Sequence, residues 1–314
     1  MCGRELLLTN TVCYVILLNM VMKTILCEGR TMIEKKTAIL VDSGCDVPQS
    51  FVKQYQIRVL PLRVSYETES LVDSVELASE VYRRFPQEIP HTSTPVMQDF
   101  YNVVEELKTE GYENVLGVFI SSNLSSTCQT AKMVLDEHPE LNSFVLDTKN
   151  ISIGAGLLAM WAAVQLEQGV SFEEVCQKLP AKVADSKVFF YMDTLEYLRK
   201  GGRIGAVTSV VGSLLKIKPI ISCNEEGIYY TVEKIRGAKA GVSKLIEHAA
   251  AKAGNGSAWL ALMNGAAAET AAQVKPKMQE AIPKGKLMAE SQIAASLAVH
   301  TGPGLLGIGV LANP

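Results

Sequence analysis

The stretch VLGVFISSNLSSTCQTAKMVLDEH, residues 115–138, passes from an apolar run through a hydroxyl-rich loop into an amphipathic segment. This pattern predicts a buried strand over Val115–Ile120 and a helix over Leu124–His138. Between the two, Ser121–Thr127 holds five hydroxyls in seven residues, more than one helix cap requires. Ligands of open α/β sheets bind at the carboxyl ends of strands, so this loop is a candidate site for an anion or a polar headgroup.

The same alternation of short apolar strands and amphipathic helices extends to both sides of this stretch. It predicts an α/β fold whose N-terminal part is a parallel sheet between two layers of helices. Pro61 suggests an edge or a bulge within the second strand. The predicted strands are Thr37–Val41, Ile57–Val64 and Ser143–Leu146, and the predicted helices are Glu76–Phe85, Met97–Thr109, Ile153–Gln168 and Phe172–Ala184.

The second half of the chain has a different pattern. Ile217–Ser222 and Ile228–Val232 flank Asn224–Gly227, which is typical of a β-hairpin and favours a mixed or antiparallel sheet. We therefore expect two α/β domains, residues 36–150 and 151–314, with room for a later segment to return to the first. The other predicted elements are strands at Val188–Met192, Ala258–Met263, Lys286–Glu290 and Leu306–Leu311, and helices at Leu195–Lys200, Ala206–Leu215, Lys239–Lys252 and Ala266–Ala281.

Composition excludes several classes of function. The 314 residues carry 30 basic and 33 acidic side chains and only 6% aromatics, so neither nucleic acid nor stable membrane insertion is expected. Seven cysteines are scattered with no CxxC pair, which argues against a disulfide framework and a zinc site. No histidine and carboxylate cluster has metal-ligand spacing either. We expect a protein of the reducing cytoplasm.

Residues 1–31 differ from the rest of the chain. The apolar run Thr11–Cys27 is interrupted by Asn19 and Lys23 and is too short and mixed for a clear membrane span. No small-residue cleavage site follows it. We therefore expect a non-native start or a disordered tail before Met32, with a signal or an anchor as the alternative.

Three further loops are candidates for binding. In His91–Pro95, adjacent hydroxyls precede a helix, which favours helix capping over anion binding. In Leu198–Gly205, Arg203 could fork onto a carboxylate or a phosphate, or the segment could be a solvated basic turn. His300 opens a glycine turn that matches GxGxxG but has no helix after it, so it is no dinucleotide site. On its own, His300 favours a structural role over a donor to an anion or a general acid–base.

Taken together and in order, seven motifs resemble the DegV family of bacterial fatty-acid-binding proteins. The likeness extends from about Lys36 to the C-terminus. Two departures are Ser126, where the family pattern has glycine, and Val96, where it has serine. The motifs are Asp42–Pro48, Val59–Leu62, Thr92–Pro95, Ile120–Ser125, Tyr197–Ile204, Ile217–Ile220 and His300–Gly304.

The resemblance implies a non-catalytic carrier with no cofactor. Its ligand would be one long-chain fatty acid, and its partner would be a separate fatty acid kinase subunit that makes acyl phosphate. Carried over by motif, Thr92, Ser93 and Ser125 would bind the carboxylate. Arg203, Arg236 and His300 would surround the headgroup and assist phosphotransfer.

Two other classes of function stay open. The first is a hydrolase or transferase of lipids or small esters, with Ser122 or Ser125 as nucleophile. It needs a base within about 2.6–3.2 Å of the hydroxyl, and His300 is the only candidate. No G-x-S-x-G elbow surrounds either serine. The second is a domain that binds a sugar or a triose through the hydroxyl-rich loops.

Overall fold

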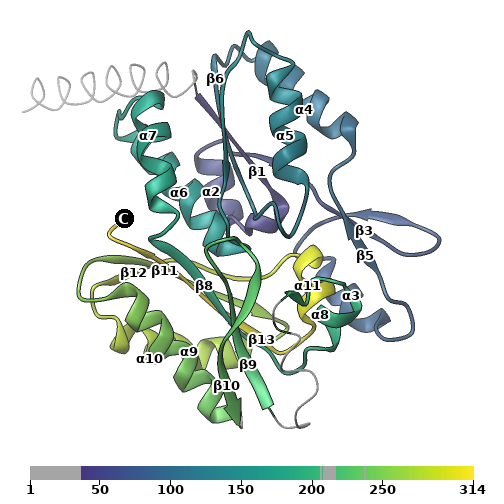
Figure 1. The fold of residues 1–314 in the computed structure, drawn as a ribbon, viewed down its shortest axis with the longest axis vertical. Helices are drawn as coiled ribbons and strands as arrows, with labels where there is room; N and C mark the ends of the chain where they lie inside the picture. The colour runs from purple at the N-terminus through teal and green to yellow at the C-terminus, as the bar shows by residue number, and fades with distance from the viewer. Residues whose placement is uncertain (1–36, 206, 208–216, 237) are drawn as a thin grey trace, which may run out of the picture.

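A computed structural model of the chain describes residues 37–205, 207, 217–236 and 238–314. Two sheets form two halves of the molecule, one above the other in Figure 1, and a small third sheet projects at the side. The predictions for residues 1–31 and for Ala206–Leu215 lie outside the described residues. Among those described, no helix is both long and apolar enough to cross a membrane.

The first sheet is parallel, with four strands in the order β2-β1-β6-β7. Different helices cover the two faces of this sheet. Successive side chains of a strand point to opposite sides, so each strand packs against both sets of helices. In β1, Ala38 and Leu40 pack with α4 and α5, whereas Ile39 and Val41 join the core that contains α6. The bounds are β1 Thr37–Asp42, β2 Arg58–Leu60, β6 Asn114–Phe119, β7 Asn142–Asp147, α4 Met97–Thr109, α5 Thr127–Asp136 and α6 Ile153–Glu167.

The second sheet is mixed, with six strands in the order β10-β9-β8-β13-β11-β12. Only β11 and β12 pair in parallel, and β9 and β10 form the predicted hairpin. Helices α9 and α10 cover the outer face. The bounds are β8 Ser186–Tyr191, β9 Ile217–Cys223, β10 Tyr229–Arg236, α9 Ala238–Ala253, β11 Ala258–Gly265, α10 Ala268–Ala281, β12 Gly285–Gln292 and β13 Leu305–Ala312.

Helix α6 joins the two halves. Residues 153–163 of this helix are buried all round, as expected for an apolar helix inside a protein. It packs against β6 of the first sheet and against β8 and β13 of the second. The α/β fold with a parallel sheet followed by a mixed sheet is therefore confirmed.

One predicted strand is wrong. Ile57–Val64 is divided at Pro61 into β2 and β3, which belong to different sheets. Proline has no N–H for a sheet ladder, so the chain leaves the first sheet there. The third sheet, of order β4-β3-β5, was not predicted, nor were α2 and α11. The remaining bounds are η1 Ser43–Cys45, α2 Gln49–Gln54, β3 Arg63–Ser65, β4 Ser70–Val72, α3 Ala78–Arg84, β5 His91–Ser93, α7 Phe172–Lys182, α8 Glu196–Lys200 and α11 Ala295–Thr301.

Candidate functional site

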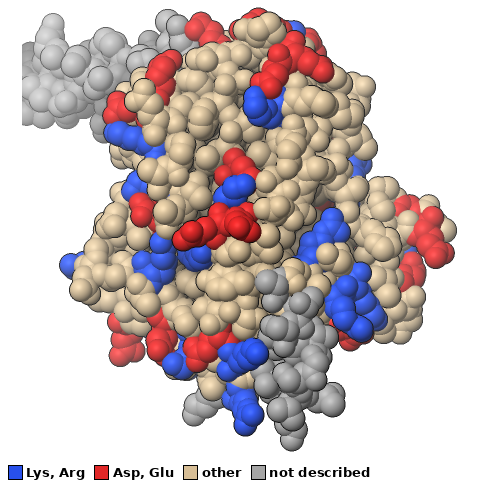
Figure 2. Space-filling view, in the orientation of Figure 1, with Lys and Arg blue, Asp and Glu red and all other residues tan. Residues whose placement is uncertain are grey.

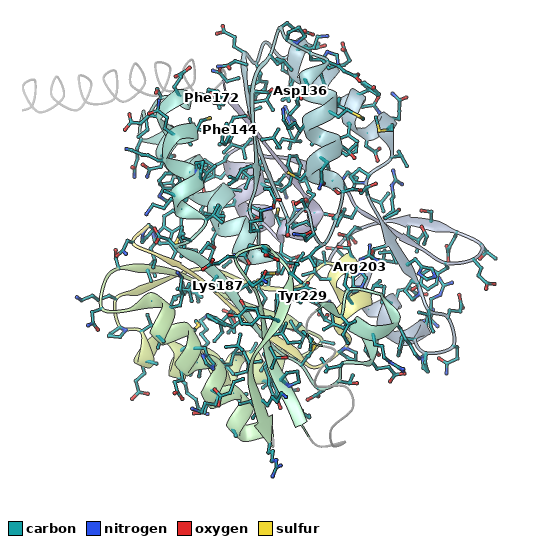
Figure 3. The ribbon with its side chains drawn as sticks, viewed as in Figure 1. Asp136, Phe144, Phe172, Lys187, Arg203 and Tyr229 are labelled. Atoms are coloured by element: carbon teal, nitrogen blue, oxygen red, sulfur yellow. The ribbon has the colours of Figure 1, made fainter. Side chains whose placement is uncertain are left out.

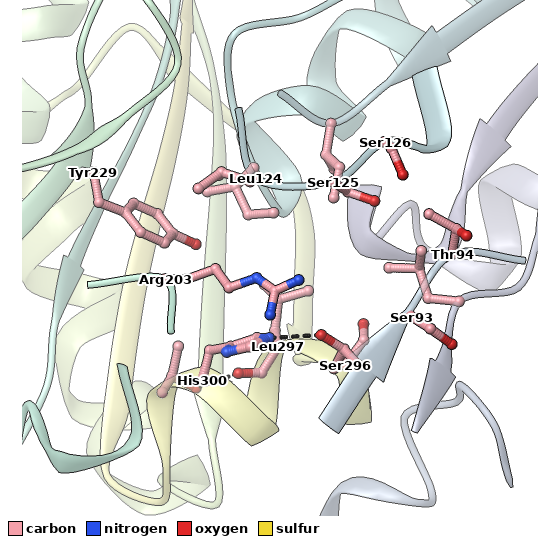
Figure 4. Close-up of a pocket in the computed structure, with 15 residues that line it drawn as sticks. Ser93, Thr94, Leu124, Ser125, Ser126, Arg203, Tyr229, Ser296, Leu297 and His300 are labelled. Atoms are coloured by element: carbon pink, nitrogen blue, oxygen red, sulfur yellow. Dashed lines mark hydrogen bonds between the residues drawn. The ribbon is translucent and has the colours of Figure 1, made fainter. Parts of the chain in front are cut away.

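A cavity of about 270 Å³ lies where the first sheet, the third sheet and α11 meet β10 (Figure 4). Hydroxyls, one guanidinium and one imidazole line it together with apolar side chains, so it has a polar and an apolar part. The lining residues are Leu62, Thr92, Ser93, Thr94, Ile120, Leu124, Ser125, Ser126, Ile151, Arg203, Tyr229, Ser296, Leu297, His300 and Thr301.

The hydroxyls of Thr92 and Ser93 do not cap α4, so the favoured interpretation of that loop is wrong. They lie on β5, which pairs with β3. Helix α4 is capped instead at Val96, whose N–H donates to the Asp99 carboxylate at 3.1 Å. Thr92 Oγ1 is 2.8 Å from His300 Nε2, while the Ser93 hydroxyl has no hydrogen bond in the described part of the chain. The hydroxyl of Ser93 is therefore available to a ligand.

The hydroxyl loop after β6 has two separate roles. Ser121 is fully buried, and its Oγ accepts from the Asn123 N–H at 3.2 Å, which holds the turn. Ser125 lines the cavity, and its Oγ lies 2.8 Å from Thr127 Oγ1. Ser126 also lines the cavity, whereas Ser122 is not among the lining residues. Helix α5 begins at Thr127, three residues later than predicted, because this turn comes first.

Arg203 reaches the cavity from the glycine turn after α8. A Cβ at Gly201 would lie 2.1 Å from His300 Nδ1, so only glycine lets this turn approach the imidazole. Gly202 has φ of 71°, a conformation that favours glycine. Arg203 Nη1 donates to the Gly201 carbonyl at 3.0 Å, and within the described residues no carboxylate forms an ion pair with it. Figure 4 shows its guanidinium between Tyr229 and His300.

His300 lies on α11 rather than in a turn, and it is part-buried. Burial lowers the pKa of its imidazole to about 3, and the positive charge of Arg203 lowers it further. The ring is therefore neutral near pH 7. Its Nε2 contacts Thr92, while Nδ1 has no partner in the described part of the chain. No hydrogen bond joins this ring to Ser122 or Ser125 in the ranges described, so the pairing that a serine nucleophile needs is not made.

The sequence interpretation missed several lining residues and included one that lies elsewhere. Tyr229 was missed because successive side chains of β10 point to opposite sides, and the local pattern does not say which side faces the cavity. Tyr229 points into this cavity and Tyr230 to the other side of the strand. Leu297 was missed with the whole of α11. Arg236 is exposed at the other end of β10 and does not line the cavity.

Three buried aspartates, Asp42, Asp46 and Asp73, lie behind the cavity. Asp73 accepts from the Ser296 N–H at 2.7 Å, the Ser296 hydroxyl at 2.6 Å and the Ser43 hydroxyl at 2.6 Å. Asp46 accepts from the Ala294 N–H at 3.0 Å and from Ser152 Oγ at 2.5 Å. Carboxylates of the first half thus hold the start of α11, the helix that carries Leu297 and His300.

These aspartates affect one another through their charges. Burial raises the pKa of both Asp42 and Asp46 to about 7, against hydrogen bonds that lower it, and the nearby Asp73 charge adds to the increase. Burial also raises the pKa of Asp73. In the described ranges, no group of three His, Cys, Asp or Glu residues could hold a metal ion. The hydrogen bonds to the start of α11 assign Asp46 and Asp73 to holding the two halves together, whereas Asp42 accepts from the Ile120 N–H within the first half.

Fold and cavity together define a class of protein: two α/β halves that enclose a small pocket with a polar end and apolar walls. A family model described as "Uncharacterised protein, DegV family" matches residues 36–313. A DegV domain-containing protein of Clostridium acetobutylicum is 39% identical over 275 residues, which cover 87% of this chain and 98% of that protein. The chain belongs to the DegV family.

Solved structures of the same family have the same fold. A fatty-acid-binding DegV family protein from Thermus thermophilus has a TM-score of 0.82 at 29% identity, covering 88% of this chain and 99% of that one. A stearic-acid-binding protein from Eubacterium ventriosum has a TM-score of 0.79 at 26% identity, covering 87% of this chain and 97% of that one. Relatives of this chain are therefore bacterial proteins, some of which bind fatty acids.

Proposed function

We propose that this chain binds one long-chain fatty acid, with the carboxylate at the polar end of the cavity, and presents it to a separate fatty acid kinase in the cytoplasm. The observation that carries the proposal is the cavity itself. A guanidinium without an ion-pair partner in the described ranges, and several hydroxyls, lie beside the apolar side chains of Leu62, Leu124 and Leu297. An acyl carboxylate needs this combination, because a buried charge without donors is costly.

Thr92 supplies a donor at the centre of the proposed carboxylate site, and His300 orients its hydroxyl. A neutral imidazole carries one proton, on either nitrogen. If Nε2 carries it, the ring donates to Thr92 Oγ1, and the threonine hydroxyl can donate its own proton to the ligand. Ser93 supplies a second donor on the same strand. Ser125 faces them from the start of α5, as Figure 4 shows.

Arg203 has a different role in the proposal. Its guanidinium donates to the Gly201 carbonyl and has no carboxylate partner among the described residues. A phosphate carries more negative charge than a carboxylate, so a cation at this point favours the reaction path toward acyl phosphate. Arg203 and His300 therefore contribute more to phosphotransfer by a kinase than to binding of the unmodified fatty acid. The proposal gives this chain no catalytic residue and no cofactor.

Burial of the acyl chain supplies the affinity. Each buried CH₂ contributes roughly 0.8 kcal/mol, so a long chain contributes on the order of 10 kcal/mol before association costs. The polar end then serves to orient the ligand. This division predicts that a short-chain acid with the same carboxylate binds far more weakly.

The decisive experiment is mass spectrometry of lipid extracted from the purified protein, followed by titration of delipidated protein with stearate and with butyrate. We expect about one long-chain acid per chain and saturable binding of stearate only. Binding of sugars or of neither acid would refute the proposal. Labelling of Ser122 or Ser125 by a fluorophosphonate would support the hydrolase alternative instead.

A further inference from the structure

A second cavity, of about 560 Å³, lies on the other side of β10 from the proposed fatty acid site. Tyr230 lines it, whereas the preceding Tyr229 lines the first cavity. Its walls come from β8, β10, α9 and the loop after β7, so it too lies where the halves meet. The lining residues are Thr148, Lys149, Asn150, Pro180, Val183, Ala184, Ser186, Lys187, Phe189, Asn224, Glu225, Tyr230, Val232, His248, Ala251 and Lys252.

Lys187 is the unusual group in this cavity. It is half-buried on β8, and its Nζ lies 5.8 Å from the centre of the Tyr230 ring. In the part of the chain that the structure describes, no carboxylate forms an ion pair with it. Burial lowers the pKa of Lys187 and the charge of Lys252 lowers it further, whereas Cys223, with a larger effect than Lys252, and Glu225 raise it. Among the described residues, the site thus holds an amino group without an ion-pair partner.

Lys252 adds a second positive charge. Its Nζ donates to the Ala184 carbonyl at 2.6 Å, a neutral acceptor, and burial lowers its pKa too. The other charged groups of the lining have a partner or are exposed. Lys149 pairs with Asp147 at 2.7 Å, His248 contacts Glu233 at 2.8 Å, and Glu225 is exposed at the hairpin. Asp185, which pairs with Lys182, acts on Lys252 only at a distance, so within the described ranges two neighbouring lysines without a carboxylate ion-pair partner face the cavity.

Apolar surface lies beside these lysines. The Phe189 ring stacks on His248 with centroids 5.9 Å apart, and Val232 and Tyr230 continue the wall along β10. Lys and Arg side chains lie at the middle left of Figure 2 next to Asp and Glu side chains, at the level where Figure 3 labels Lys187. A ligand here would meet charge at one end and flat apolar groups at the other.

We propose that this cavity binds a small phosphate monoester, with its phosphate on Lys187 and Lys252 and its apolar group against Phe189, Tyr230 and Val232. Two cations favour a dianion, and a phosphate monoester carries about −1.5 to −2 charges near pH 7. Placing it between the lysines removes their mutual repulsion. The site is separate from the fatty acid cavity and independent of its function.

Isothermal titration with phenyl phosphate, inorganic phosphate and benzoate tests the proposal on the full chain. Phenyl phosphate should bind saturably. Inorganic phosphate should bind more weakly because it lacks the ring, and benzoate more weakly because it carries one charge. Lys187→Met should weaken phenyl phosphate binding at least tenfold, whereas Lys187→Arg should retain it.

Lys178→Met is the matched control, because Lys178 lies on α7, is exposed and pairs with Glu174. It should bind phenyl phosphate as the wild type does. Absence of saturable binding, equal affinity for benzoate, or undiminished binding by Lys187→Met would overturn the proposal. Stearate titration of Lys187→Met should be unchanged, so failure here is distinguishable from failure of the fatty acid proposal.

Discussion

Two groups of polar side chains meet between the halves of the molecule, and they differ in how fully their hydrogen-bonding capacity is used. Asp46 and Asp73 accept from hydroxyls and from backbone N–H groups of α11. In the lining of the first cavity, His300 Nδ1 has no partner within the described residues, and neither the exposed Ser93 hydroxyl nor the half-buried Arg203 guanidinium pairs with a carboxylate or a hydroxyl there. Buried polar groups are nearly always paired, so we assign the aspartates a structural role and the cavity lining a role in binding.

The largest expected effect is a loss of stability when one of the buried aspartates is removed. Asp73→Ala removes the acceptor of three hydrogen bonds and leaves the hydroxyl protons of Ser43 and Ser296 and the Ser296 N–H without this acceptor. Because each unpaired buried donor costs roughly 1–3 kcal/mol, we expect a loss of about 3–5 kcal/mol in the free energy of unfolding. Urea denaturation at pH 6 measures it. Asp136→Ala, at an exposed pair with Lys132, is the control and should change stability by less than about 0.5 kcal/mol.

The same aspartates predict how stability depends on pH. The pKa of Asp42 and of Asp46 is about 7 in the folded chain, above the unfolded value near 3.8. A pKa that is raised in the folded state stabilises the fold at pH values below the pKa of the unfolded chain. This contribution is lost as the pH rises through 7. From pH 5 to pH 8, each group should lower the free energy of unfolding by on the order of 2 kcal/mol.

Denaturation curves of the wild type and of Asp46→Asn, recorded from pH 5 to pH 8, check this prediction. The variant keeps the side-chain shape without the titrating proton, so its stability should change less with pH. A wild type whose stability rises from pH 5 to pH 8 would contradict the assigned direction of both pKa shifts.

Hydroxyls that line the first cavity should affect binding more than stability. Ser125→Ala and Thr92→Val each remove a proposed donor to a carboxylate, which is worth roughly 1.5–3 kcal/mol, or about ten- to a hundredfold in affinity. Stearate titration measures the loss, with Ser122→Ala as a control outside the cavity lining. Equal weakening by the control would show that the hydroxyls act through the fold of the loop.

Arg203→Ala and His300→Ala should bind stearate more nearly as the wild type does, yet slow acyl phosphate formation by a fatty acid kinase. Charge at the headgroup increases toward the phosphorylated state, so cationic and imidazole donors matter more there. A kinase assay and a titration on the same variants separate the two steps. Parallel losses in both assays would refute the division of roles.

The smallest expected effect is that of pH on binding. The pKa of His300 is about 3, so the ring stays neutral from pH 6 to pH 8. Stearate affinity should change by less than about threefold over this range, because a neutral side chain contributes no titration. A transition near pH 6.5 that disappears in His300→Gln would show that the ring is more exposed than the structure has it.

Local patterns predicted the architecture well, but they did not predict the contacts between distant segments. Val115–Ile120 and the hairpin at Asn224–Gly227 follow from periodicity and turn chemistry. The contact between Thr92 and His300 joins residues 208 apart in sequence, and no local pattern encodes it. Likewise, hydroxyls before a proline usually cap a helix, so the sequence favours that role for Thr92 and Ser93. Here the pairing of β5 with β3 overrides that preference.

Strand β13 lies between β8 and β11, although it follows both in the chain. During synthesis the first sheet has all its strands once Asp147 has been made, whereas the second cannot close until Leu305–Ala312 leaves the ribosome. Until then β8 and β11 each have an open edge, the kind of surface at which unfinished chains aggregate. Helix α11 emerges only just before β13, so the nascent chain has no complete cavity and no ligand can assist its folding. Occupancy of the site thus requires that α11 and β13 have been made and that the second half has folded.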